Sequence, residues 1–157
     1  MVKSMMTALG AAVVGIAALG FCGTSYAENI VVKELNKGPD GFFVFEPDLV
    51  KIKPGDSVSF VAADKGHDVQ SVPGMIPAGA QPFKSPMSQN LAVTFTQPGV
   101  YVFECMPHVS LGMVGVIVVG SPGNLQQVDT SKLPNKARQK VAAIFQQITS
   151  TSTADAR

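Results

Sequence analysis

The sequence predicts a mainly β protein, a two-sheet sandwich or barrel followed by a helical C-terminal extension. Three observations lead to this prediction. Short apolar runs with strand-like alternation recur between residues 30 and 120, and Gly and Pro turns separate them. A long loop with several Pro residues interrupts the series. After Gly120 the spacing of apolar residues becomes helical. Strands of this length and spacing are typical of sandwiches and barrels.

The predicted strands follow one another in short order. They cover residues 30–35, 42–47, 49–53, 58–62, 92–96, 100–105 and 113–120. The run LVKIK at 49–53 alternates apolar and basic residues, as a half-buried strand does. Turns are expected at GPDG (38–41), PGDS (54–57) and QPG (97–99). The last of these turns predicts a hairpin between 92–96 and 100–105.

Two further segments differ from this pattern. Residues 72–90 form a long loop with four Pro residues, which suggests a functional loop or the cover of a sheet edge, with room for one helical turn. Residues 121–128 could hold a short helix. Beyond Pro134, four apolar residues at helical spacing predict a helix of about three to four turns that docks on the sandwich. They are Val141, Ile144, Phe145 and Ile148.

The N-terminal region predicts a secretory signal peptide over residues 1–27. Lys3 supplies the positive start, residues 8–21 are apolar, and Ser25-Tyr26-Ala27 offers a cleavage site after Ala27. A retained anchor and a lipoprotein modified at Cys22 are less consistent with the short apolar run and the bulky Phe21. The expected organisation is a sandwich at 28–120, a helical extension of the same domain at 121–149, and a disordered tail at 150–157.

Charge and cysteine content restrict the functions that remain. The chain has 12 Lys and Arg against 11 Asp and Glu, so it lacks the basic excess of a nucleic-acid surface. Of its two cysteines, Cys22 leaves with the leader. The mature chain then cannot form an internal disulfide. A lone thiol in an oxidising compartment is a liability unless something such as a metal occupies it.

Metal-ligand side chains are concentrated in one loop. In ECMPHVSLGMVG, Cys105, His108 and Met113 fall within nine positions, and the other histidine, His67, follows a predicted strand and turn. Two His and one Cys in a plane with a distant axial Met form the blue-copper arrangement. With Cys105 ending one strand and Met113 starting the next, the loop between them would wrap a metal. The sequence therefore predicts one copper ion held by His67, Cys105, His108 and Met113.

Other uses of these residues are possible. A Cys nucleophile with a His base would need an oxyanion feature, which is not evident. Haem attachment would need C-x-x-C-H, and structural zinc usually takes four His or Cys ligands, whereas the mature chain has three. Each residue taken singly could also be structural. The conjunction of a β-rich exported domain, one free Cys, two His and a nearby Met favours the metal site.

The sequence also resembles the pseudoazurins, bacterial periplasmic members of the cupredoxin family. The resemblance covers nearly all of residues 28–148 and depends on LNKGPDG, VFEP, PGDSVSF, DKGHDV, GMIPAGA, FKS, VTFTQPGVY, C-x-P-H and GMVGV. It implies a Greek-key cupredoxin β-sandwich with two C-terminal α-helices and one type 1 copper. His67, Cys105, His108 and Met113 occupy the matching ligand positions. Plastocyanins share the spacing of the ligand loop but lack the helical extension.

The resemblance further implies a soluble periplasmic one-electron carrier, not an enzyme, that donates electrons to copper nitrite reductase in denitrification. A c-type cytochrome is a second possible redox partner, an amine dehydrogenase a third, and a monomer is expected. Docking would use an apolar collar around an exposed His108 edge, with Lys37, Lys65 and Lys84 nearby. The collar residues would be Pro39, Met106, Pro107, Val109 and Leu111. The alternative function is a periplasmic copper carrier or chaperone.

Three positions depart from the family pattern. Asp68 replaces the usual Asn after the first His, and it should join the two ligand loops and lower the reduction potential. Phe43 replaces an aliphatic or Met side chain, and it could pack on the His108 ring. Glu104 replaces a frequent Lys, and it should weaken the basic field around the copper face.

Overall fold

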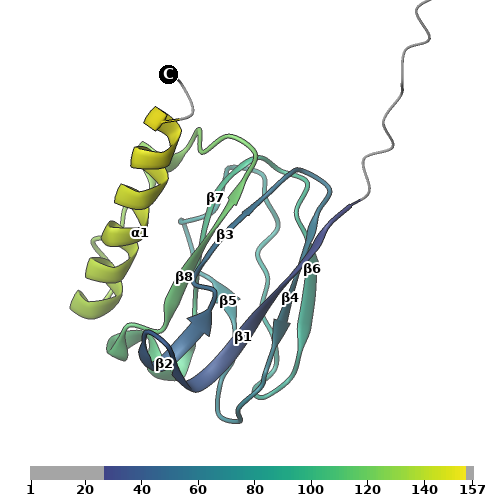
Figure 1. Cartoon of the computed structure of the whole chain (residues 1–157), viewed down its shortest axis with the longest axis vertical. Helices are drawn as coiled ribbons and strands as arrows, with labels where there is room; N and C mark the ends of the chain where they lie inside the picture. Colours follow the sequence, from purple (N-terminus) through teal and green to yellow (C-terminus); the bar gives the residue numbers. More distant parts are fainter. Residues whose placement is uncertain (1–26, 155–157) are drawn as a thin grey trace, which may run out of the picture.

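Two four-stranded sheets pack face to face, with one α-helix on the outside. The computed structural model describes residues 27–154, so most of the predicted leader lies outside the described residues. Figure 1 shows the two sheets and, at their side, helix α1 (Asn135–Ala154). In the part of the chain described, no helix is long and apolar enough to cross a membrane.

The first sheet has the order β2-β1-β4-β6 and the second the order β3-β8-β7-β5. Neighbours are antiparallel except β1 with β4 and β3 with β8, which run parallel. The elements of the first sheet are β1 (Asn29–Gly38), β2 (Gly41–Glu46), β4 (Ser57–Val61) and β6 (Leu91–Thr94). Those of the second are β3 (Leu49–Ile52), β5 (Gln70–Ser71), β7 (Gly99–Glu104) and β8 (Val114–Val119).

Strands β7 and β8 are buried on both faces, because the second sheet lies between the first sheet and α1. In β7, Tyr101 and Phe103 point into the core between the sheets, whereas Val100 and Val102 belong to the cluster under the helix. All residues of both strands are buried. Two-sided burial explains why GVYVFE and VGVIVV read as continuous apolar runs rather than alternating ones. The predicted ligands Cys105 and Met113 adjoin one end of this strand pair.

The hairpin predicted between residues 92–96 and 100–105 is wrong. Strand β6 pairs with β4 in the first sheet, whereas β7 pairs with β8 and β5 in the second. The Pro-Gly turn therefore carries the chain from one sheet to the other. Asn124 secures the start of β7, because its side chain accepts from Val100 N–H and donates to Val100 C=O. A turn signal between two apolar runs does not reveal which sheet each run joins.

The expected pair of C-terminal α-helices is corrected to one α-helix among the described residues. The segment after Gly120 forms a 3-10 helix, η2 (Leu125–Gln127), and the chain becomes extended at Val128. Helix α1 runs to Ala154, beyond the boundary predicted at 149, so residues 150–154 are helical rather than a disordered tail. Its predicted apolar stripe is confirmed, since Val141, Ile144 and Ile148 are buried against β7 and β8. A salt bridge of 3.0 Å from Lys140 to Asp48 also ties the helix to the sandwich.

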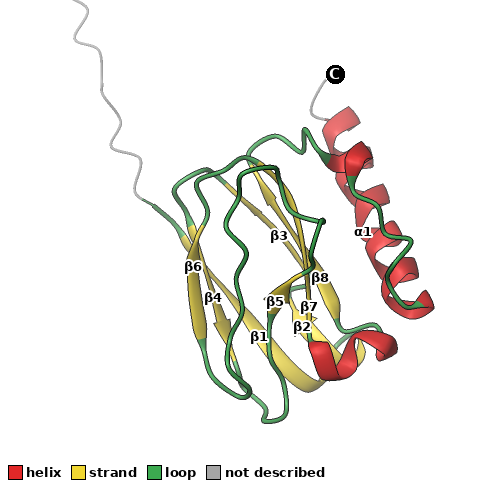
Figure 2. Cartoon of the chain, turned by 180° about the vertical axis from the view of Figure 1, so that it is seen from behind, coloured by secondary structure: helices red, strands yellow, loops and turns green. Residues whose placement is uncertain are grey.

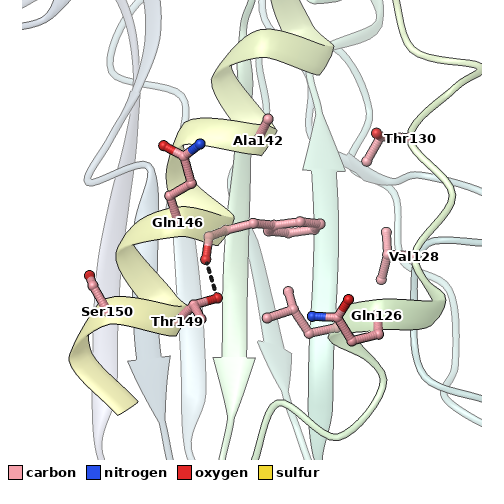
Figure 3. A pocket seen from close by; sticks show the side chains of 9 residues that line it. Gln126, Val128, Thr130, Ala142, Gln146, Thr149 and Ser150 are labelled. Atoms are coloured by element: carbon pink, nitrogen blue, oxygen red, sulfur yellow. Dashed lines mark hydrogen bonds between the residues drawn. The ribbon is translucent and has the colours of Figure 1, made fainter. Parts of the chain in front are cut away.

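A groove of about 590 Å³ runs between η2 and α1, as Figure 3 shows. Phe145 lines this groove, and Thr149 Oγ1 donates a hydrogen bond to the Phe145 carbonyl. Leu125 and Val128 line the opposite wall. None of the predicted metal ligands lines this groove. It separates the helix from the η2 segment and takes no part in the site described next.

Candidate metal centre

Three predicted ligand side chains converge at one end of the sandwich. The Nδ1 or Nε2 atoms of His67 and His108 and the Sγ atom of Cys105 all lie within 4.8 Å of one another. Sγ is 3.7 Å from His67 Nδ1 and 3.4 Å from His108 Nδ1. His67 and Cys105 are fully buried, and His108 is half-buried. The structure thus brings together three of the four residues that the sequence predicts as metal ligands, and their role as ligands stays a prediction.

The loop that carries two of them is a short helix held between the ends of two strands. Cys105 follows β7 and precedes the 3-10 helix η1 (Met106–Leu111), visible in Figure 2 as the short helix beside the lower, N-terminal end of α1. The His108 N–H donates to the Cys105 carbonyl over 3.0 Å, which folds the loop back on itself. Gly112 ends η1 with φ 97, a left-handed conformation that suits glycine. This sharp end returns the chain directly into β8.

Met113 lies where the loop closes, at the start of the return strand. Its carbonyl accepts from Cys105 N–H over 3.0 Å, and its own N–H donates to the His108 carbonyl over 3.2 Å. Its side chain is fully buried in the same core cluster as Cys105. The backbone of Met113 is thus fixed to both ligand residues of the loop, and its role as a ligand stays a prediction.

Asn36 orients the buried histidine, and it is not among the residues predicted from the sequence. Its Oδ1 atom accepts a hydrogen bond from His67 Nε2 over 2.9 Å. With the proton on Nε2, the lone pair of Nδ1 is free and faces the Cys105 sulfur. Burial, followed by the charge of His108, lowers the pKa of His67, which favours the neutral imidazole that binds metal. The sequence did contain a signal, because strand alternation places Asn36, although exposed, on the same face of β1 as buried Val32.

Asp68 joins the two ligand segments, as expected. Its Oδ1 atom accepts from the Met106 N–H over 2.8 Å, and the side chain is 4% exposed. This contact links the residue after His67 to the residue after Cys105. A hydrogen bond to a carboxyl oxygen therefore fixes the distance between the two ligand segments. The negative charge of a carboxylate makes such a hydrogen bond stronger.

Phe43 packs on the half-exposed histidine, so the contact suggested by the sequence is confirmed. The rings of Phe43 and His108 are stacked, with centroids 4.3 Å apart and planes at 12°. Phe43 has φ 54, a conformation that non-glycine residues adopt rarely and at some cost in energy. The β2 backbone thus holds this ring over the imidazole in a strained conformation, which limits the freedom of His108.

The surface around His108 is apolar, with lysines beside it. Phe42, Met106 and Leu111 are 68%, 53% and 48% exposed, and the Lys37 ammonium lies 5.7 Å from the Phe42 ring centre. Pro39 and Pro107 are also exposed, but Val109 packs against the core under α1 and does not belong to this collar. Glu104 is buried and accepts from Gln70 Nε2 over 2.9 Å, so it is not a surface charge.

The donor set fits a soft, redox-active metal. Two imidazole nitrogens and one sulfur surround a common point, and thiolate with imidazole favours copper among the transition metals. In the metal-free protein, burial raises the pKa of the Cys105 thiol to about 11, while main-chain N–H groups of Asp68 and His108 act in the opposite direction. The free thiol is therefore protonated at neutral pH. Metal binding must displace this proton, so the affinity should rise with pH.

Replacing Asn36 with Ala is expected to lower copper affinity about 10- to 100-fold, because His67 loses the partner that fixes its ring and tautomer. Competition against a chelator of known affinity measures the effect. Asn29→Ala is the matched control, because this asparagine on the same strand bonds Ser59 and lies outside the site. Equal affinities for Asn36→Ala and the unmodified protein would contradict the assigned role.

Comparison with known proteins agrees with this geometry. Residues 32–120 match the model for copper-binding proteins of the plastocyanin/azurin family. The pseudoazurin of Paracoccus pantotrophus is 40% identical over 144 residues, which span 91% of this chain and 96% of that protein. A putative pseudoazurin of Rhizobium leguminosarum is 47% identical over 119 residues, 75% of this chain and 78% of the relative.

A solved structure shows the same fold. The crystal structure of pseudoazurin from Methylobacterium extorquens AM1 superposes with a TM-score of 0.74 at 41% identity, covering 77% of this chain and 99% of that chain. At this identity and coverage the likeness extends beyond the fold to the family.

Proposed function

This chain belongs to the plastocyanin/azurin family of copper-binding proteins, and within it to the pseudoazurins; on this premise we propose that it donates single electrons to copper nitrite reductase in the periplasm. At the family level it is a blue copper electron carrier with one type 1 copper, and not an enzyme. The observation that carries the proposal is the convergence of His67 Nδ1, His108 Nδ1 and Cys105 Sγ.

His67, Cys105, His108 and Met113 would hold the copper. When bound, the metal supplies a Cu(II)/Cu(I) couple that accepts and releases one electron. Three residues of this chain would hold the ligands in place during that change. Asn36 fixes the His67 ring, Asp68 fixes the η1 segment, and Phe43 covers the His108 ring. A site held in this way needs little rearrangement on electron transfer.

His108 supplies the route for the electron to the partner. It is half-buried, whereas His67 and Cys105 are fully buried, so its ring edge is the part of the ligand cluster nearest to solvent. Exposed Met106 and Leu111 belong to the same short helix as His108, and exposed Phe42 precedes Phe43, which stacks on the His108 ring. Such a surface favours brief encounters, which suit a carrier that must leave its partner quickly.

Lysines next to the site support an acidic partner surface. Lys37 follows Asn36, Lys65 precedes Gly66 and His67, and both lysines are exposed, as is Lys84. Positive charge around the docking face increases the encounter rate with an acidic partner at low salt. Glu104 is buried and hydrogen-bonded to Gln70, so its side chain does not contact a partner at this face. A copper nitrite reductase or a c-type cytochrome of suitable charge could then accept or supply the electron.

The periplasmic location is supported by the predicted leader at 1–27. The periplasm is an oxidising compartment, and a bound metal would protect the lone thiol of Cys105 from oxidation there.

Leu111→Asp is expected to slow reoxidation of the reduced protein by copper nitrite reductase about tenfold, because it places a charge in the apolar docking face. Stopped-flow second-order rate constants at several salt concentrations measure the effect. Val31→Asp is the matched control, because Val31 is 45% exposed, similar to Leu111 at 48%, and lies near the start of β1. Equal rates for the two variants, both with an intact visible spectrum, would contradict docking through this face.

Asp68→Asn is expected to raise the reduction potential by an amount on the order of tens of millivolts, because a buried carboxylate near the metal favours the more positive oxidised state. The amide keeps an oxygen that can accept from Met106 N–H, so the loop contact survives. Protein-film voltammetry measures the change. An unchanged potential with an unchanged visible spectrum would show that this side chain has no electrostatic role.

A further inference from the structure

Strand β1 carries a buried carboxyl group that the electron-carrier function leaves unexplained. Glu34 is 0% exposed, and neither of its carboxyl oxygens has a hydrogen-bond partner within residues 27–154. Its backbone is ordinary, since it pairs with Phe45 of β2 and accepts from the Asp64 N–H. Burying an unpartnered carboxylate is unfavourable, so such a group tends to hold a proton.

Glu34 lies within electrostatic reach of the ligand cluster. It shares the inward face of β1 with Asn36, two residues further on, which bonds His67. Burial, and then the charge of Asp68, raise the pKa of Glu34 to about 7. Burial also raises the pKa of the Cys105 thiol, with a smaller contribution in the same direction from Glu34. Charge on the thiolate and charge on Glu34 therefore oppose each other.

No basic partner neutralises Glu34 among the described residues. The salt bridge that the structure contains joins Lys140 to Asp48. Strand β4 has no ionisable side chain, and the residue opposite Glu34 on β2 is Phe45. The elements packed around it carry several ionisable groups. They are Glu46 on β2, Asp64, Lys65, His67 and Asp68 on the loop after β4, Tyr101 and Glu104 on β7, and Cys105 and His108 after β7. Lys33 and Lys37 lie on the opposite, outward face of β1.

We propose that Glu34 is a redox-linked proton site, so that this protein carries a proton together with its electron. The inference rests on the proposed copper function. When the site gains one electron from its donor, an O–H bond forms between a Glu34 carboxylate oxygen and a proton from solvent. When the electron passes to the acceptor, that bond breaks and the proton returns to solvent. One added electron and one added proton leave the net charge of the buried region unchanged.

The ionisation of Glu34 is well placed for such coupling. A carboxyl group with a pKa near 7 is partly protonated at neutral pH, so a change in nearby charge alters its proton occupancy. Oxidation adds positive charge and favours the carboxylate. Reduction removes that charge and favours the acid. The reduction potential should therefore fall as pH rises through about 7, where Glu34 changes protonation between the two redox states.

Infrared difference spectroscopy of the copper-loaded protein at pH 7 tests the proposal. Reduction should create a carboxylic acid C=O band in the unmodified protein and should not create it in Glu34→Gln. Glu46→Gln is the matched control, because it removes a partly exposed carboxyl group from the neighbouring strand and should keep the band. Protonation of the His108 imidazole on reduction gives no such band. Glu34→Met, a similar chain length without a charge, is the second variant if Glu34→Gln does not fold.

The potential measured against pH is the second readout, and Glu34→Gln should lose the slope around pH 7. Absence of the band in the unmodified protein overturns the proposal, as does a band that persists in both Glu34 variants. Failure of the copper function would appear differently, as the absence of an intense, reducible visible band. The metal-free protein separates the two results, because its Glu34 band should disappear between pH 6 and 8, near the pKa of about 7, without any metal. A metal-free band that does not titrate also overturns the proposal.

Discussion

Replacing Cys105 with Ser is expected to abolish the intense visible absorption of the copper-loaded protein. That absorption arises from charge transfer between a thiolate and the metal, and Cys105 is the cysteine that the structure places between the two histidine Nδ1 atoms. An alcohol is a poor, hard ligand for copper by comparison. The visible spectrum of the variant with one equivalent of Cu(II) measures the loss, which should exceed about tenfold in intensity, and stable reversible redox cycling should be lost with it.

The matched control for Cys105→Ser is Ser85→Ala, a change of a buried hydroxyl outside the ligand set. Ser85 Oγ accepts from the Val69 N–H, so its loss should affect stability and leave the absorption in place. Far-ultraviolet circular dichroism shows whether each variant is folded. An intense band that survives in folded Cys105→Ser would mean that the metal does not bind this sulfur.

The second large effect concerns the pH dependence of folding without metal. The pKa of Glu34 is raised from 4.5 to about 7 in the folded protein, so the folded state binds more protons than the unfolded state between these pH values. The contribution of Glu34 to the free energy of unfolding is then fully present below about pH 4.5 and is lost as pH rises through about 7. The slope reaches about 1.4 kcal/mol per pH unit.

His67 acts in the opposite direction, because its pKa is lowered and the folded protein binds fewer protons there below pH 6.5. A comparison with Glu34→Gln cancels this contribution. Urea unfolding of both metal-free proteins from pH 5 to pH 8 measures the effect. As pH rises to about 7, the free energy of unfolding of the unmodified protein should fall relative to that of Glu34→Gln, and above about pH 7 the difference should stay constant. Parallel stability curves would show that Glu34 is charged in the folded protein throughout this range.

Local patterns in the sequence identified most strands, because alternation and turn residues are properties of short segments. The arrangement of these strands depends on contacts between distant residues. The Pro98-Gly99 turn therefore suggested a hairpin, although β6 and β7 belong to different sheets. The two-residue strand β5 was missed because such a short run has no measurable period. The end of α1 was also set too early, since the polar residues after Ile148 give no apolar pattern to follow.

The metal site was more predictable than the fold around it, because ligand chemistry restricts residue types as well as spacing. Cys105, His108 and Met113 lie close in the sequence, and His67 was the remaining histidine. The groups that support the ligands were harder to find. Asn36 and Glu34 read as polar positions of an ordinary strand, and strand alternation alone places them on the same face of β1 as buried Val32. The partner of Asn36, His67, lies on a loop that the strand pattern does not place, and the carboxyl group of Glu34 has no hydrogen-bond partner among the described residues.

The measurement that tests the copper assignment most directly is the visible spectrum of the purified mature protein with one equivalent of Cu(II), before and after ascorbate. We predict an intense thiolate-to-copper band that saturates at one copper per chain, disappears on reduction and returns on reoxidation. A pale or colourless protein whose Cys105 still reacts as a free thiol would contradict the assignment of His67, Cys105, His108 and Met113 as a type 1 site. A site that binds copper but releases it rapidly to a chelator would instead indicate a copper carrier.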